Sequence, residues 1–167
     1  MNDNTVRVTY LELTRSPSPI RERLGDERIG RESLPVSEYL DLYGRVGKSL
    51  RWDQRLRMPR SELTRLLESE SSQIYVLRDG SDGALGFCEF ERHLPDIELR
   101  NFGIVAAAQG RGLGTWLLRT ALYQEWSVQP NRIWLHTDSW DHPAAIRLYQ
   151  DAGFQICMVR EEPPGDL

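Results

Sequence analysis

The sequence contains almost no lysine and little cysteine. Lys48 is the only lysine, so nearly all of the 21 basic residues are arginine. Cys88 and Cys157, the only cysteines, form neither a CxxC motif nor a spacing typical of a zinc site. We predict that both are small buried hydrophobic residues in strands. This sparse use of cysteine favours a reducing compartment, the cytoplasm.

Long hydrophobic runs and an excess of positive charge are also absent. No apolar run approaches the roughly 20 residues that span a bilayer, and residues 1–13 lack the basic and apolar regions of a signal peptide. We therefore expect no membrane partner. The net charge of −4 argues against nucleic acid as the main partner, because duplex binding depends on the neutralisation of phosphates.

The 167 residues, 40% of them hydrophobic, are enough for one domain with a sizeable core. We place this domain at residues 1–160 and expect a flexible acidic tail at residues 161–167. Residues 14–35, rich in Pro, Arg and Gly, are expected to form a loop or lid. Ser37 and Asp141 are the expected N-caps of the first and last helices. The predicted strands cover residues 5–13, 73–79, 84–91, 97–105, 132–138 and 154–160, and the predicted helices begin at Ser37 and near Ser61 and cover 112–126 and 142–151. The order β-α-α-β-β-β-α-β-α-β predicts an α/β (α+β) fold, a mixed sheet flanked by helices.

The most informative segment is an apolar strand, a glycine-rich turn and an amphipathic helix at residues 102–118. Gly110, Gly112 and Gly114 allow a phosphate to approach backbone N–H groups at the positive end of a helix dipole. The turn lacks the lysine of a Walker A loop. Its glycines run GxGxG after several strands, whereas a dinucleotide fingerprint places GxGxxG early in a βαβ unit. A pyrophosphate loop of another class and a turn that only starts a helix are the remaining interpretations.

Two motifs in the second half of the chain occur together in one known family. Residues 109–114 (QGRGLG) match Q-x-x-G-x-G, and residues 141–154 (DHPAAIRLYQDAGF) match N-x-x-A-x-x-x-Y-x-x-x-G-F except at its first position, which is His142. With these motifs the chain resembles the GCN5-related N-acetyltransferases (GNAT superfamily) over roughly residues 72–160. LHTDSWDHPAA (135–145) is similar to a bacterial subgroup of unsettled substrate. The resemblance implies a mostly antiparallel central sheet and acetyl-CoA as co-substrate.

The resemblance also assigns residues to acetyl-CoA. The backbone of Phe102, Gly103 and Ile104 would pair with the pantetheine arm, at a strand that diverges from its neighbour. The residues that would hold the pyrophosphate are Gln109, Gly110, Arg111, Gly112, Leu113 and Gly114, with the Arg111 guanidinium as a counter-charge. His142 stands where the family usually has an Asn that touches the cofactor, and it equally suits a helix cap beside Pro143.

Two roles remain for the reaction itself. Tyr149, in register within the second motif, is the expected general acid that protonates the departing thiolate, since a phenol with a pKa of roughly 10 is protonated at neutral pH. Glu98 is the expected general base that removes a proton from the amine. Its rivals are Glu89, Glu91, His136 and Asp138, while Thr137 occupies a position where one branch of the family carries its base. We expect no metal, because His136, Asp138 and His142 match no standard zinc spacing.

The expected function is therefore N-acetyl transfer from acetyl-CoA to a primary amine of a small molecule, by direct attack in a ternary complex. Acetylation of protein N-termini or lysines and an acyl-CoA sensor without turnover are the alternatives. The aromatic residues Tyr39, Tyr43, Trp52 and Trp140 are candidates for an acceptor pocket or, equally, for the core. Because few residues follow Gly153, the sheet is expected to end in an open edge that the partner in a homodimer would cover.

Overall fold

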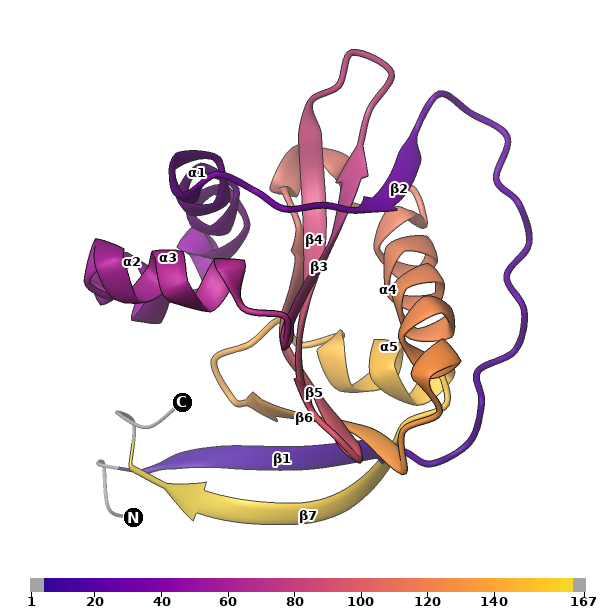
Figure 1. Ribbon diagram of the computed structural model, residues 1–167. Coiled ribbons are helices and arrows are strands. Elements are labelled where there is room, and N and C mark those ends of the chain that lie inside the picture. Colours follow the sequence, from indigo (N-terminus) through magenta and orange to yellow (C-terminus); the bar gives the residue numbers. More distant parts are fainter. Residues whose placement is uncertain (1–4, 164–167) are drawn as a thin grey trace.

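A seven-stranded sheet runs through the computed structural model, which describes residues 5–163. Figure 1 shows α1–α3 beside one side of the strands β3–β5, and α4 and α5 on the other side. The strands are β1 (Val6–Leu13), β2 (Arg28–Arg31), β3 (Ser72–Arg78), β4 (Ala84–His93), β5 (Asp96–Ile104), β6 (Arg132–Asp138) and β7 (Gln155–Glu162). The helices are α1 (Val36–Gly47), α2 (Gln54–Arg57), α3 (Arg60–Glu68), α4 (Leu113–Glu125) and α5 (Ala145–Asp151), with short 3-10 turns η1 (Lys48–Leu50), η2 (Ala106–Ala108) and η3 (Trp126–Val128).

The sheet has the order β2-β3-β4-β5-β6-β1-β7, and its single parallel pair is β5–β6. This confirms the predicted mixed, mostly antiparallel sheet. The parallel pairing is short: it runs from Asp96 opposite Arg132 to Glu98 opposite Trp134 and goes no further within the described residues. Beyond Glu98, β5 remains paired to β4 alone, so one edge of its backbone is left without a neighbouring strand.

The first strand of the chain occupies an interior position in the sheet. β1 lies between β6 and β7 and is antiparallel to both, with Tyr10 opposite His136 on one side and Met158 on the other. β1 thus occupies the position next to β6, and β7 is the outer strand at that end of the sheet. Ile156 and Val159 on β7 are exposed. Periodicity predicts each of these strands but carries no information on which strands pair, since pairing is a long-range property.

The helices are held to the sheet by buried apolar faces. Leu117, Leu118, Ala121 and Leu122 of α4 are fully buried in the same core as Phe87. On α1, Tyr39 and Tyr43 recur at helical spacing and their rings lie 5.9 and 6.5 Å from that of Phe87. None of the helices within residues 5–163 has both the length and the apolar character to cross a membrane.

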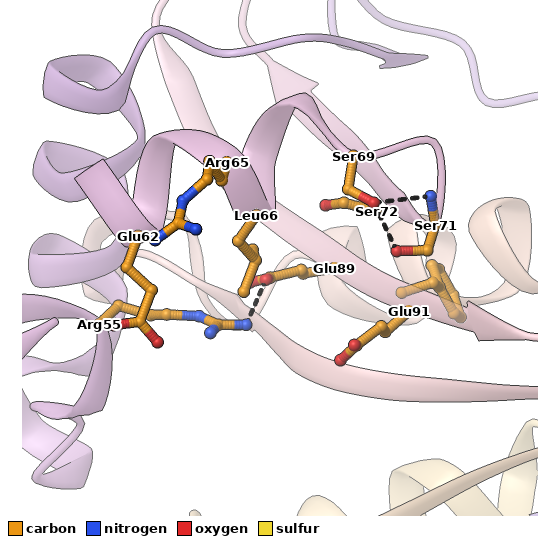
Figure 2. A pocket seen from close by; sticks show the side chains of 10 residues that line it. Arg55, Glu62, Arg65, Leu66, Ser69, Ser71, Ser72, Glu89 and Glu91 are labelled. Atoms are coloured by element: carbon orange, nitrogen blue, oxygen red, sulfur yellow. Dashed lines mark hydrogen bonds and ion pairs between the residues drawn. The ribbon is translucent and has the colours of Figure 1, made fainter. Parts of the chain in front are cut away.

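A buried polar cluster centred on Glu89 of β4 joins α1 and α2 to the sheet. One carboxylate oxygen accepts a hydrogen bond from Arg55 Nη2 at 2.6 Å, and the other accepts from the Tyr39 hydroxyl at 2.5 Å and from Asn101 Nδ2 at 2.8 Å. The side chains of Arg55 and Glu89 are 3% and 2% exposed. Figure 2 shows this pair near Glu62 of α3. Arg55, Glu89, Glu62 and Arg65 all line a cavity of about 420 Å³. A buried charge needs such partners, because loss of hydration is otherwise uncompensated.

Several boundaries differ from those that the sequence predicts. Residues 14–35 contain the strand β2, which pairs with β3, in addition to the predicted loop. The helix α2 is also absent from the prediction; it is a single turn, too short for a periodic signal. The prediction of Ser37 as an N-cap is wrong: α1 begins at Val36, and Pro35 precedes it with no side-chain cap.

The last strand, β7, bears on the predicted tail at residues 161–167. β7 runs to Glu162, so residues 161 and 162 belong to the sheet, while residues 164–167 of the predicted tail lie outside the described residues.

Cys88 is buried as predicted, but the prediction for Cys157 is wrong. Cys157 is exposed because it lies on the outer strand β7, most of whose residues are exposed.

We expect Arg55→Met to destabilise the protein by about 3–5 kcal/mol, because it leaves the Glu89 carboxylate buried without its counter-charge. Arg57→Met is the matched control: Arg57 pairs with Asp53 at 3.0 Å on the surface, and such pairs contribute at most about 1 kcal/mol. Denaturant unfolding of both variants gives the two free energies. Equal losses would contradict the role assigned to the buried pair.

Candidate active site

A cleft with a volume of about 840 Å³ opens where β5 and β6 diverge. One wall comes from β5 and the glycine turn, another from the end of β6 and α5, and the α1–α2 segment lies across it. The principal lining residues are Tyr43, Arg51, Trp52, Arg57, Arg100, Phe102, Gly103, Ile104, Gln109, Gly110, Gly112, Leu113, Gly114, His136, Asp138, Trp140, Asp141, His142 and Tyr149. Most of the residues that the sequence predicts for acetyl-CoA therefore share one cleft.

The glycine turn has the geometry of an anion cradle. Gly110 and Gly112 have φ of 79° and 73°, a left-handed conformation that residues with a Cβ rarely adopt. Gly112 is the N-cap of α4 and has no side-chain cap, so the first N–H groups of a 13-residue helix remain available at the cleft. A Cβ on Gly110 would meet no atom within 4 Å, which shows open space above the turn. These features fit a phosphate group.

Arg111 is the exception within the turn. It does not line the cleft; its guanidinium forms an ion pair with Glu27, in the loop between β1 and β2. The side chain of Glu27 is only 12% exposed. The structure therefore places the expected counter-charge against the loop and away from the cleft wall.

On β5, Phe102, Gly103 and Ile104 lie beside the unpaired strand edge and line the cleft. Gly103 has a packing reason for its identity: a Cβ there would lie 2.5 Å from Cγ1 of Val46 in α1. The lack of a side chain thus lets α1 approach the strand that forms the cleft wall. Backbone N–H and C=O groups on such an edge are free to bond an extended ligand arm.

Tyr149 of α5 is a buried residue that lines the cleft. Its ring lies 6.1 Å from that of Phe102 and 5.9 Å from that of Phe154. Burial raises the pKa of the Tyr149 hydroxyl well above its ordinary value of 10, and the negative charge of Asp141 adds to the shift. No hydrogen bond to this hydroxyl is formed within the described residues. A protonated, unengaged phenol is therefore available as a proton donor.

Asp141 ties the end of β6 to the α1–α2 segment. Its carboxylate accepts hydrogen bonds from Thr137 Oγ1 at 2.6 Å, from the Asp138 backbone N–H at 3.2 Å and from Trp52 Nε1 at 3.4 Å. The prediction of Asp141 as an N-cap is wrong, because α5 begins later, at Ala145. These bonds also show that Thr137 is a donor to Asp141.

His142 combines its two expected features. Its Nδ1 accepts the backbone N–H of Ala144 at 3.1 Å, immediately before α5, and the residue also lines the cleft. The cap-like bond fixes Nδ1 as the acceptor, which leaves Nε2 as the nitrogen that carries the proton when the ring is neutral. Nε2 is thus free to donate a hydrogen bond into the cleft.

Glu98 lies just behind the cleft wall. It is 5% exposed, its carboxylate accepts hydrogen bonds from Arg100 Nη1 at 3.2 and 3.3 Å, and its Oε1 is 4.0 Å from His136 Nε2. His136 and Arg100 line the cleft, whereas Glu98 does not. His136 therefore reaches the cleft, and the Glu98 carboxylate contacts it from behind.

The other candidate bases are placed differently. Both carboxylate oxygens of Glu89 are engaged in the buried cluster, and Glu91 lies 3.0 Å from His93 Nε2, outside the cleft. Asp138 does line the cleft. Burial raises the pKa of Asp138, and the charge of Asp141 contributes in the same direction, while the backbone N–H of Trp140 counteracts it.

His136, Asp138 and His142, whose spacing matches no standard zinc site, are not grouped as potential metal ligands in the described part of the chain. A different group, Glu91, His93 and Glu98, has ligand-type atoms within 4.8 Å of one another. Arg100 lies between its carboxylates, 3.8 Å from Glu91 and 3.2 Å from Glu98. A guanidinium already supplies the positive charge there, so we assign no metal to this group.

The four aromatic candidates divide between pocket and core. Tyr43, Trp52 and Trp140 line the cleft, whereas Tyr39 belongs to the buried Glu89 cluster. The Arg51 guanidinium lies 5.4 Å from the centre of the Trp140 ring, a cation–π contact across the cleft. Sequence reasoning missed Arg51, Arg100 and the bridging role of Asp141, because isolated charged residues carry no periodic or motif signal.

Comparisons with known proteins agree with this architecture. The profile of the acetyltransferase (GNAT) family matches residues 39–154. A mycothiol acetyltransferase from Mycobacterium sp. (strain JLS) is 37% identical over 87 residues, which is 48% of this chain and 28% of that protein. A GCN5-related N-acetyltransferase from Sphaerobacter thermophilus superimposes with a TM-score of 0.65 at 16% identity, over 97% of this chain and 53% of the other.

A GNAT family acetyltransferase from Elizabethkingia anophelis, solved with acetyl-CoA bound, has a TM-score of 0.60 at 16% identity over 80% of this chain and 78% of that one. At such identities the structural matches establish the fold. The chain spans well under half the length of the curated relatives that it matches and about half of the Sphaerobacter protein. By the extent of the family match, the chain belongs to the GNAT family of acetyltransferases.

Proposed function

We propose that this chain transfers an acetyl group from acetyl-CoA to a primary amine of a small molecule, by direct attack in a ternary complex. The observation that carries the proposal is the single cleft that joins the glycine turn, the free edge of β5 and the Tyr149 hydroxyl. The turn would hold the pyrophosphate, and the strand edge the pantetheine arm. Acetyl-CoA supplies an activated thioester. The match to mycothiol acetyltransferase supports a small-molecule acceptor.

The chain's own residues then handle two protons. His136 takes a proton from the attacking amine, and Glu98, 4.0 Å behind it, stabilises the resulting imidazolium. As the C–N bond forms and the C–S bond breaks, the Tyr149 hydroxyl donates its proton to the departing sulfur. The raised pKa of Tyr149 keeps its hydroxyl protonated at neutral pH, so a proton is present when the sulfur departs.

Calorimetric titration with acetyl-CoA, with NADH and ATP as controls, tests the donor, and a thiol-release assay over a panel of amines tests turnover.

We expect Tyr149→Phe to lower kcat by about 100-fold or more while the Kd of acetyl-CoA stays within twofold, because only proton transfer is lost. Tyr123→Phe, on the exposed side of α4, is the matched control. A wild-type protein that binds acetyl-CoA but releases no thiol with any small amine or peptide would instead support a sensor. Turnover of peptides alone would favour protein acetylation.

For the base, we expect His136→Gln to lower kcat by about 100-fold, since general base catalysis contributes factors of this size. Glu98→Gln should lower kcat less, because Glu98 acts through His136. Asp138→Asn tests the rival carboxylate on the cleft wall. A larger loss in Asp138→Asn than in His136→Gln would contradict the assignment to His136.

The outer strand β7 supports a homodimer as part of the proposal. Two copies that pair β7 edge to edge around a twofold axis would cover Ile156 and Val159, which are 46% and 44% exposed. We expect sedimentation velocity to give twice the 19.3 kDa chain mass, and Val159→Lys to give the single-chain mass. A wild-type protein that sediments as one chain at micromolar concentration would refute the dimer.

We also propose that the protein acts in the cytoplasm. The support is that both cysteines, one buried and one exposed, are free thiols, the state that a reducing compartment maintains.

A further inference from the structure

The loop between β1 and β2 lies against the glycine turn. In Figure 1 it runs along the outer side of α4 towards β2, at the end of the molecule where α4 begins. Two contacts connect the loop to the turn: Glu27 pairs with Arg111, and Arg23 Nη1 lies 3.6 Å from the position that a Cβ on Gly112 would occupy. The loop therefore brings a cation to the N-cap of α4.

Arg23 has the features of a ligand-binding cation. It is exposed, and it forms no ion pair within residues 5–163, unlike Arg28 at the other end of the segment, which pairs with Asp82. Its guanidinium stands beside the one residue of the turn that both caps the helix and lines the cleft. A phosphate on the N–H groups of this turn would lie within reach of Arg23, which presents a fork of donors suited to phosphate oxygens.

Arg111 has the complementary geometry. Arg23 and Arg111 both stand outside the residues that line the cleft, but the Arg111 guanidinium is paired with Glu27, which is nearly buried although Arg111 itself is 53% exposed. The ion pair attaches the loop to the turn four residues after Arg23. Arg111 is thus placed to position the loop, and the loop residue takes the place of the counter-charge that the turn's own arginine does not provide.

We propose that Arg23 binds the pyrophosphate of acetyl-CoA from the β1–β2 loop, and that the Arg111–Glu27 ion pair holds the loop so that Arg23 reaches it. This inference rests on the proposed function. It adds a binding residue outside residues 39–154, the part of the chain that the family profile matches.

Calorimetry on the full chain tests the contact. We expect Arg23→Ala to weaken acetyl-CoA binding by about tenfold, as is usual for one charge-assisted contact, and the loss to shrink at high salt. Arg15→Ala, in the same loop and exposed, removes the same charge and should leave the Kd unchanged.

S-acetylpantetheine, which lacks phosphates, should bind Arg23→Ala and wild type equally. The tenfold loss should persist with dephospho-CoA; if it disappears there, the contact is with the 3′-phosphate and the assignment is overturned.

A double-variant cycle tests the role of Arg111. If Arg111 acts by positioning Arg23, then Arg111→Ala weakens binding, but Arg23→Ala with Arg111→Ala is no weaker than Arg23→Ala alone. Additive losses would mean that Arg111 itself binds phosphate, which would overturn the positioning role. An unchanged Kd in Arg23→Ala, with wild type still binding acetyl-CoA, would refute only this inference. No binding by folded wild type would refute the proposed function together with it.

Discussion

The structure depends on the early end of the pairing between β5 and β6. The two strands pair side by side for three residue pairs and then diverge, because β5 continues along β4 whereas β6 follows β1. A sheet whose neighbouring strands separate leaves backbone groups without partners, and these must be satisfied by water or by a ligand. The main walls of the cleft follow from this: the strand edge forms one of them, and both the turn that follows β5 and the helix that follows β6 line it.

A diverging sheet needs ties between its two halves, and polar groups provide them. Asp141 links the end of β6 to Trp52, and Arg51 covers the Trp140 ring. On the other half, the Glu89 cluster fixes α2 to β4, so the segment between α1 and α2 that carries Trp52 has a rigid base. These interactions join elements far apart in the sequence, and a fully satisfied buried polar network adds rigidity. Preorganisation of this kind lowers the cost of ordering a ligand and its surroundings.

A feature of the fold or of the cleft can be predicted from the sequence when it depends on a few consecutive residues. The glycine turn and the α5 motif are local: positive φ at Gly110 and Gly112 and the spacing to Tyr149 follow from a few consecutive residues. The position of β1 between β6 and β7 is not, and neither is the burial of Glu89, which depends on Arg55, Tyr39 and Asn101 arriving from three other segments. The N-caps were misjudged for a related reason. Asp141 is a good cap by residue type, but α5 begins later, at Ala145, and the Asp141 carboxylate accepts hydrogen bonds from Thr137 and from the distant Trp52.

The charge of the chain illustrates the same distinction. A net charge of −4 opposes polyanion binding when the whole molecule is considered. A single bound pyrophosphate, however, senses only charges within a screening length of roughly 8–10 Å. At that scale the surroundings of the turn are positive, with the N-terminus of α4 and Arg23 beside Gly112. Composition therefore argues against a long polyanion such as nucleic acid and leaves a compact phosphorylated cofactor compatible, because the two ligands sample the field of this protein over different distances.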